Sequence, residues 1–259
     1  MNRARRKFVL LLVEGPSDIT ALYKPLKALF QEVDPSLVLM PLFPQNNRNN
    51  DLTAEQLEDP EKLEGLISKV FIHDFLEQNS LLPKDIMRVI HIVDLDGAFI
   101  PRANVCRREG KIYYDDSVIY TSDVEGIRRR NQIKSNNLEY LSSQNRLSIF
   151  PKKGGSDMRE KSYSVFYFSS NLDHFLHGTA NMPAEEKVPR AREFSRKCEL
   201  DPEFFINFFT RHDEDVCGMS YSDSWKYIKE GLNSLRAHSN LGILVNELLK
   251  ESKKRNHIS

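Results

Sequence analysis

The first apolar run of the chain is residues 8–13 (FVLLLV), which follows a basic segment, 1–7, and ends at the polar turn EGPSD. Apolar residues then recur at three- and four-residue steps as far as residue 31. A short apolar run bounded by Gly and Pro predicts a strand that is buried on both faces, as in a parallel sheet. Ser17 and Asp18 are typical of a helix start, so a helix is expected to follow. Glu14 therefore lies where a buried strand gives way to a helix, and in open α/β sheets that edge binds ligands.

The same alternation of strands and helices is predicted further along the chain. Strands are expected at 37–43, 87–94, 118–120 and 163–169 and helices at 60–79 and 123–143, whereas 98–117 is expected to be irregular. This order predicts an α/β fold with a mostly parallel sheet, right-handed crossovers and flanking helices. The pattern of residues 183–259 is helical. We therefore expect an α/β domain at 1–180 and a helical C-terminal region at 181–259 that packs on it.

A second strand-to-turn junction also carries carboxylates. Asp94 and Asp96 follow the apolar run VIHIV and precede Gly97, and on a continuing strand they would face the same side. If the two strands are neighbours, Glu14, Asp94 and Asp96 converge at one edge of the sheet. Three carboxylates together raise one another's pKa values, and a hard divalent cation such as Mg²⁺ or Mn²⁺ removes that cost. Asp18, one turn beyond Glu14, is either a further metal ligand or a residue that stabilises the helix N-terminus.

These two junctions together resemble the TOPRIM domain of topoisomerases, bacterial primases and a class of nucleases. Glu14 in VEGPSD matches the first motif of that family and Asp94-Leu95-Asp96 in VDLDG the second, over about residues 7–100. The arrangement looks most like the nuclease domains of the overcoming-lysogenization-defect group and related phage-defence proteins. The resemblance implies a TOPRIM-like (Rossmann-like) fold and a Mg²⁺- or Mn²⁺-dependent nuclease that cleaves DNA or RNA, with Glu14, Asp94 and Asp96 as catalytic residues. It also implies a role in phage or mobile-element defence, with a separately encoded ATPase as a partner.

The same resemblance adds a candidate after the strand at 163–169. In the overcoming-lysogenization-defect nucleases a late strand leads to acidic residues that complete the metal site. Asp173 is the matching candidate here, although Asn171 stands where a carboxylate is expected. The alternative is a helix N-terminus that is capped by Ser170 or Asn171 and has Asp173 in its first turn.

Two basic stretches are candidates for nucleic-acid binding. Arg102, Arg107 and Arg108 follow the Asp pair, and Lys152 and Lys153 lie in a loop. They are predicted to contact phosphates, or else to be ordinary solvated loops. Arg128 to Arg130 and Lys134 form a basic cluster on the helix at 123–143. Such a cluster is usually a solvated face, and the alternative is that it follows a nucleic-acid backbone. The net charge is +0, so any binding face for nucleic acid must be local.

The composition is that of a globular protein, with 40% apolar and 29% charged residues. The three cysteines are far apart and predict free thiols, and no apolar segment is long enough for a membrane span, so a cytoplasmic location without membrane association is expected. A second hypothesis is a non-catalytic TOPRIM-like module that binds nucleic acid or a protein. In that hypothesis the C-terminal helices mediate assembly, for instance as a homodimer.

Overall fold

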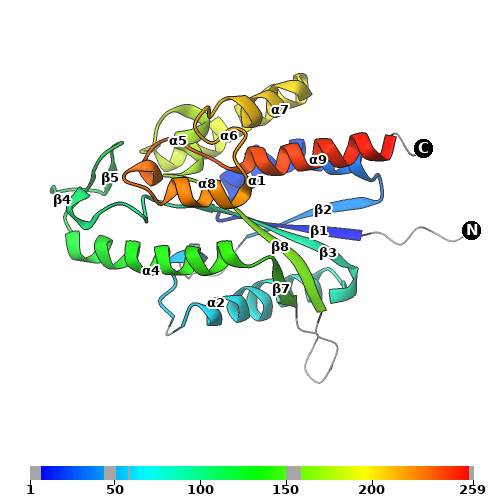
Figure 1. Ribbon diagram of the computed structural model, residues 1–259, viewed down its shortest axis with the longest axis horizontal. Coiled ribbons are helices and arrows are strands. Elements are labelled where there is room, and N and C mark those ends of the chain that lie inside the picture. Colours follow the sequence, from blue (N-terminus) through cyan, green and yellow to red (C-terminus); the bar gives the residue numbers. More distant parts are fainter. Residues whose placement is uncertain (1–6, 44–50, 58, 150–158, 257–259) are drawn as a thin grey trace, which may run out of the picture.

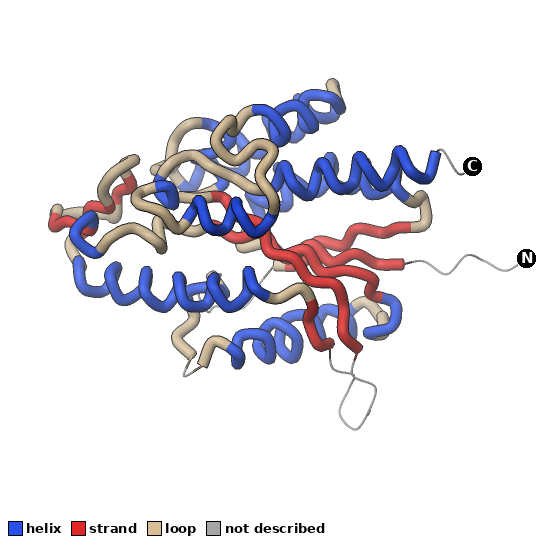
Figure 2. The backbone as a smooth tube through the Cα atoms, in the orientation of Figure 1, coloured by secondary structure: helices blue, strands red, loops and turns tan. Residues whose placement is uncertain are grey.

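The computed structural model of the protein describes residues 7–43, 51–57, 59–149 and 159–256. Its centre is a five-stranded sheet with the strand order β2-β1-β3-β8-β7. Neighbouring strands are parallel, except that β7 runs antiparallel to β8. The strands are β1 (Lys7–Leu12), β2 (Leu37–Leu42), β3 (Ile86–Asp94), β7 (Arg146–Ile149) and β8 (Arg159–Phe168) (Figures 1 and 2).

Helices cover both faces of this sheet (Figure 1). One face packs against α1 (Pro16–Val33), α5 (Leu172–His177), α6 (Ala184–Leu200), α7 (Pro202–Arg211) and α9 (Leu241–Asn256). The other packs against α2 (Glu61–Leu66), α3 (His73–Gln78), α4 (Val124–Ser143) and α8 (Tyr221–Ile228). The predicted α/β class, with a mostly parallel sheet flanked by helices, is confirmed. Among the described residues, no helix is long and apolar enough to cross a membrane.

The first strand shows why the apolar runs form a central sheet. Val9 and Leu11 lie in the core on the α1 side, whereas Leu10 and Leu12 lie in the core on the α4 side, and all four side chains are fully buried. A strand that is covered on both faces needs apolar residues at every position. Full burial of each such side chain contributes about 1.5–3 kcal/mol to folding. The strand therefore fixes the place of Glu14, two residues beyond its end.

Three features differ from the predicted elements. The helix predicted at 60–79 is α2 and α3 joined by a π-helical stretch, Ile67–Ile72. The edge strand β7 was not predicted, because it has only four residues. The segment expected to be irregular contains β4 (Val105–Arg107) and β5 (Tyr113–Tyr114), which flank β6 (Ile119–Thr121) in a small second sheet. Strands of two or three residues are too short to show an alternating pattern.

The C-terminal part of the chain returns to the end of β8. Ser239 forms an antiparallel bridge with Phe168, and the Ser169 amide donates to the His238 carbonyl over 2.9 Å. The Tyr167 amide donates to the Asn240 side chain over 2.8 Å. The segment 236–240 therefore supports the point at which β8 leaves the sheet, next to the predicted site.

Candidate active site at the carboxyl edge of the sheet

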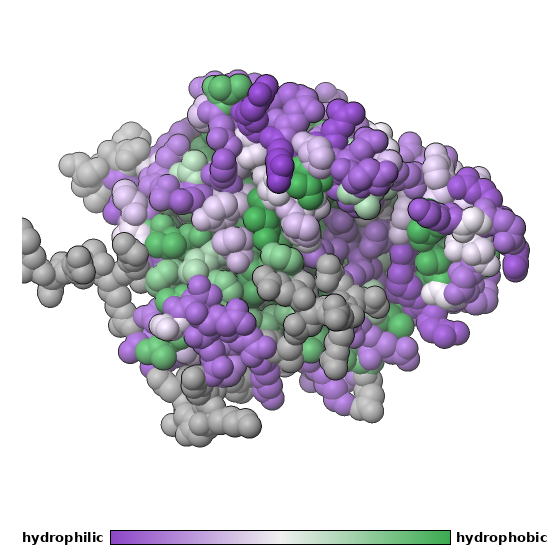
Figure 3. Space-filling view, turned by 180° about the vertical axis from the view of Figure 1, so that it is seen from behind, coloured by the Kyte–Doolittle hydropathy of each residue, from purple (hydrophilic) through white to green (hydrophobic). Residues whose placement is uncertain are grey.

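The topology brings the predicted carboxylates to one edge of the sheet. β1 lies between β2 and β3, and β3 lies between β1 and β8, all in parallel. Glu14 follows β1, Asp94 ends β3, and Asp173 lies in the first turn of α5, which follows β8. Viewed from behind, the surface is hollowed between the upper helices and the lobe that carries β4 and β5, and hydrophilic residues line this hollow (Figure 3).

Asp94 and Asp96 do not lie on a continuing strand. β3 ends at Asp94, and Asp96 and Gly97 adopt left-handed backbone conformations with φ of 50° and 68°. The Asp96 amide donates to the Ser170 carbonyl over 2.9 Å, which fixes this turn against the end of β8. The expectation that both side chains face one side of a strand is therefore wrong. Each of the two carboxylates belongs to a different cluster of charges.

The first cluster surrounds Lys134 of α4. Its ammonium lies 2.6 Å from Asp51 Oδ2 and 2.7 Å from Asp96 Oδ2, and its side chain is 0% exposed. Burial lowers the pKa of Lys134, but the charges of Asp51, Asp96 and Glu14 outweigh burial and hold this pKa well above its ordinary value. The prediction that Lys134 belongs to a solvated basic face is therefore wrong. Asp51 was not predicted, because it follows a polar stretch without a periodic pattern.

Glu14 and Asp96 respond differently to this cluster. Burial raises the pKa of Asp96, but Lys134 and Arg130 outweigh it, so this pKa lies below its ordinary value. Burial raises the pKa of Glu14 well above its ordinary value, and the neighbouring carboxylates add to the effect of burial. Glu14 Oε1 is buried, and no described residue forms a hydrogen bond with it. Asp96 is thus held as a carboxylate, whereas Glu14 lacks a cation close enough to offset its burial.

The second cluster surrounds Lys187 of α6. Lys187 Nζ lies 2.9 Å from Asp173 Oδ2, and Asp94 Oδ1 accepts a hydrogen bond of 3.0 Å from the Leu172 amide. Asp18 accepts one of 2.7 Å from the Gly15 amide at the start of α1. Burial raises the pKa of Asp18 to about 6, and burial followed by the charges of Asp18 and Asp96 raises the pKa of Asp94 well above its ordinary value.

For Asp18 and Asp173 the sequence left open a place at the helix N-terminus or a place at the predicted metal site, and the structure gives both residues features of each. Both lie in the first turn of a helix, and Asn171 caps α5 by accepting a hydrogen bond of 2.9 Å from the His174 amide. The charge of Asp173 nevertheless raises the pKa of Asp18, and the charge of Asp18 raises that of Asp94. They are helix-terminal residues whose carboxylates also belong to the edge.

Among the described residues, the edge has more negative than positive groups. Three cationic groups, those of Lys134, Lys187 and Arg130, lie among six carboxylates, which are Glu14, Asp18, Asp51, Asp94, Asp96 and Asp173. Uncompensated charge of this kind raises carboxylate pKa values. Carboxylate oxygens are the ligands that Mg²⁺ and Mn²⁺ prefer, and Glu14 Oε1 is a buried oxygen without a partner. The residue types present therefore suit a divalent cation, although the ligand atoms of Glu14, Asp94 and Asp96 do not all lie within 4.8 Å of one another.

The basic residues that were predicted to contact phosphates have different neighbours in the structure. Arg102 is exposed and lies 3.0 Å from Glu125, and Arg107 is exposed and lies 3.6 Å from Glu109. Arg108 lies against two tyrosine rings of the small sheet. Lys152 and Lys153 lie outside the described residues.

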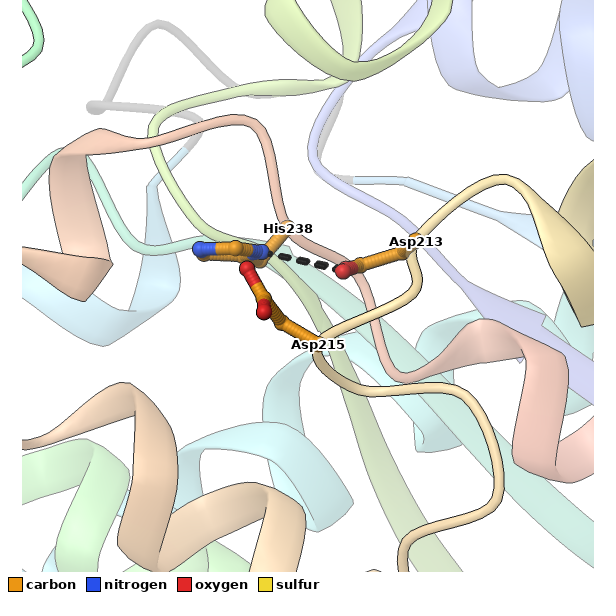
Figure 4. A group of neighbouring side chains, drawn as sticks. All are labelled: Asp213, Asp215 and His238. Atoms are coloured by element: carbon orange, nitrogen blue, oxygen red, sulfur yellow. Dashed lines mark hydrogen bonds and ion pairs between the residues drawn. The ribbon is translucent and has the colours of Figure 1, made fainter.

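A separate group of potential metal ligands includes His238, in the segment that supports the end of β8. Asp213, Asp215 and His238 each offer one ligand atom, and these atoms all lie within 4.8 Å of one another (Figure 4). Among the described residues no other group of three or more acidic, histidine or cysteine side chains forms such a cluster, and Glu14, Asp94 and Asp96 do not. Sequence reasoning missed this group, although Asp213 and Asp215 repeat the spacing of Asp94 and Asp96.

The hydrogen bonds of this group give it a structural role. Asp213 accepts from the Val216 and Ser239 amides over 3.3 and 3.0 Å, and its Oδ1 lies 3.1 Å from His238 Nδ1. His238 Nε2 lies 3.3 Å from the Tyr227 hydroxyl. Both ring nitrogens thus already have partners, and the group fastens segment 236–240 beside the end of β8.

Comparisons of the chain with protein-family models, with curated proteins and with solved structures found no match.

Proposed function

We propose that the protein is a metal-dependent phosphodiesterase that cleaves nucleic acid at the carboxyl edge of a TOPRIM-like domain. The observation that carries the proposal is the surplus of carboxylates at this edge, together with the buried Glu14 Oε1 that lacks a partner. Glu14 after β1 and the Asp94–Asp96 pair after β3 have the chain order and strand placement of the two TOPRIM motifs. Both strands are neighbours in the sheet.

The chain's own residues have distinct parts in this proposal. Glu14, Asp94 and Asp96 would hold Mg²⁺ or Mn²⁺, and Asp18 and Asp173 would hold a second ion. When bound, such ions neutralise charge on the phosphate in the transition state and lower the pKa of water. Glu14 and Asp94, with their raised pKa values, must lose protons before they bind a cation.

The two lysines differ in what they can contact. Lys134 is fully buried, so it positions Asp51 and Asp96 and does not touch the substrate. The side chain of Lys187 is 39% exposed, so its ammonium is able to meet a phosphate at the edge. The Asp96–Gly97 turn is anchored by backbone hydrogen bonds to Ser169 and Ser170. This anchoring would keep Asp96 in place as substrate binds.

One observation favours the second candidate function, a non-catalytic binding module. The Lys134 ammonium already lies between Asp51 and Asp96, where it satisfies two of the carboxylates without a metal ion. In such a module the edge would be a structural charge cluster, and the protein would bind nucleic acid or a protein partner without cleaving a bond.

Cleavage of labelled single- and double-stranded DNA and of structured RNA separates the two functions. The wild type is expected to cut at least one substrate with Mg²⁺ or Mn²⁺ and none with EDTA. Glu14→Gln and Asp94→Asn should lower the rate by at least about a hundredfold, because each removes a charged ligand. Glu199→Gln is the control, since Glu199 forms an exposed ion pair with Lys24. Retained metal-dependent cleavage in both edge variants would contradict the proposal.

Manganese binding by calorimetry gives a second readout that does not depend on turnover. The wild type should bind Mn²⁺, and the two edge variants should bind it more weakly. If the wild type binds no Mn²⁺ and cuts no substrate, the binding module becomes the better description.

A further inference from the structure

The outer face of the small sheet carries an exposed stack of aromatic and guanidinium groups. Tyr113 of β5 is paired across the sheet with Tyr120 of β6. The Arg108 guanidinium lies 4.3 Å from the centre of the Tyr113 ring and 4.8 Å from that of Tyr120. The Arg108 amide donates to the Thr121 carbonyl over 3.0 Å, which fixes this residue beside β6.

This stack is open to solvent and rich in apolar surface. Tyr113 is 40% exposed and its neighbour Ile112 is 36% exposed. They are two of the five large hydrophobic residues that are strongly exposed in the described chain, and they are consecutive. The exposed ring of Tyr113 beside the Arg108 guanidinium is a surface on which a base is able to stack.

The charge of Arg108 sets it apart from its neighbours. Arg102 and Arg107 are each paired with a glutamate. For Arg108 the described residues provide two tyrosine rings and no carboxylate within ion-pair distance. A flat cationic group over aromatic rings suits a ligand that has a π face and an adjoining negative charge, which is the chemistry of a nucleotide.

The stack is also fixed in position relative to the acidic edge. Tyr114, next to Tyr113, accepts a hydrogen bond of 2.8 Å at its hydroxyl from Arg130, which in turn donates to the Asp96 carbonyl over 3.0 Å. Asn181 binds both the amide and the carbonyl of Tyr114, over 2.8 and 2.6 Å. A ligand on the stack would therefore be held at a set position with respect to Asp96.

We propose that Arg108, Tyr113 and Tyr120 form a stacking platform for an unpaired base of the nucleic-acid substrate. The proposal rests on the proposed function and narrows its substrate class. Bases inside a continuous duplex have both faces covered by their neighbours, so the platform selects single strands or loops. It also replaces the predicted phosphate contact of Arg108 with a stacking contact.

Binding measured in EDTA tests the platform without any cleavage. The probes are fluorescein-labelled single-stranded DNA and RNA of one mixed sequence and the matching duplexes, and the readout is fluorescence anisotropy. Tyr113→Ala should weaken single-strand binding by about 5- to 150-fold, which corresponds to the loss of one base stack. Tyr113→Phe keeps the ring and should bind within about twofold of the wild type. Duplex binding should change little in either variant.

Tyr23→Ala is the matched control, because Tyr23 forms a cation–π pair with Lys27 on α1, away from the small sheet. Unchanged single-strand binding by Tyr113→Ala, an equal loss of duplex binding, or no binding by the wild type would each overturn the platform. Cleavage by the wild type together with unchanged binding by Tyr113→Ala would overturn the platform and leave the phosphodiesterase intact. Single-strand binding that is lost in Tyr113→Ala, together with no metal-dependent cleavage by the wild type, would support the platform and contradict the phosphodiesterase.

Discussion

At the scale of single residues, Lys134 is the positive charge that makes the first cluster stable without a metal ion. Its ammonium is fully buried and its two shortest contacts are both with carboxylates. A buried charge that loses its partner is strongly destabilising, because the remaining charge cannot be solvated. Asp51 and Asp96 thus depend on a cation at this position.

Lys134→Met should therefore destabilise the protein by about 3–5 kcal/mol in EDTA. Addition of Mn²⁺ should restore part of that free energy of unfolding, because the ion would supply positive charge to the same carboxylates. Urea unfolding with and without Mn²⁺ measures both effects. Lys24→Met is the control, since its ion pair with Glu199 is exposed and should contribute less than about 1 kcal/mol. A loss of stability of equal size in the two variants would contradict the role given to Lys134.

At the scale of elements, the turn after β3 places Asp96 and is closely packed. Gly97 has φ of 68°, and a Cβ built there would lie 2.5 Å from the Leu235 side chain. Gly97→Ala should lower the free energy of unfolding by about 2–4 kcal/mol, because backbone strain and overpacking add together.

Gly218→Ala is the matched variant for this turn. Gly218 also has positive φ, 83°, but a Cβ there would meet nothing within 4 Å. Gly218→Ala should lower the free energy of unfolding by about 1 kcal/mol, because the substitution adds only backbone strain. Chemical denaturation of both variants gives the comparison. Equal costs would mean that contact with Leu235 does not restrict the turn.

The long elements were predictable from sequence because their apolar patterns are long. The apolar run at 8–13 and the helical pattern at 123–143 are long enough to predict, and β6 matches the strand predicted at 118–120, whereas the short strands β4 and β5 were not predicted. The burial of Lys134 also had a signal, since it lies four and seven residues before Leu138 and Leu141, which are buried on the same helix face. Asp51 and the left-handed Asp96 had none, because their positions depend on contacts between distant segments.

At the scale of the whole molecule, the surplus of carboxylates links the proposed metal binding to pH. The pKa of Asp18 is about 6 and those of Glu14 and Asp94 lie well above their ordinary values, all mainly through burial. Below pH 6 Asp18 holds a proton that a metal ion must displace, and the raised pKa values of Glu14 and Asp94 act in the same direction, so metal binding strengthens as the pH rises. Mn²⁺ should therefore raise the melting temperature more at pH 8 than at pH 5.5.

Thermal unfolding at both pH values, with Mn²⁺ and with EDTA, measures this difference. Asp94→Asn should reduce the shift at pH 8, since it removes one of the charged ligands. A shift that is as large at pH 5.5 as at pH 8 would show that the ion binds without displacing protons from the edge.

The sheet topology also has a consequence for how the protein is made. The edge combines residues from Glu14 to Lys187, and the segment that supports β8 comes later still, at 236–240. Because a ribosome releases these parts in order, β1 cannot pair with β3 until β3 has been synthesised, and β3 cannot pair with β8 until β8 has been synthesised. The carboxylates and their lysines come together only after Lys187 and the segment 236–240 have been synthesised. Fragments from synthesis that stops before residue 187 would lack any activity of this edge.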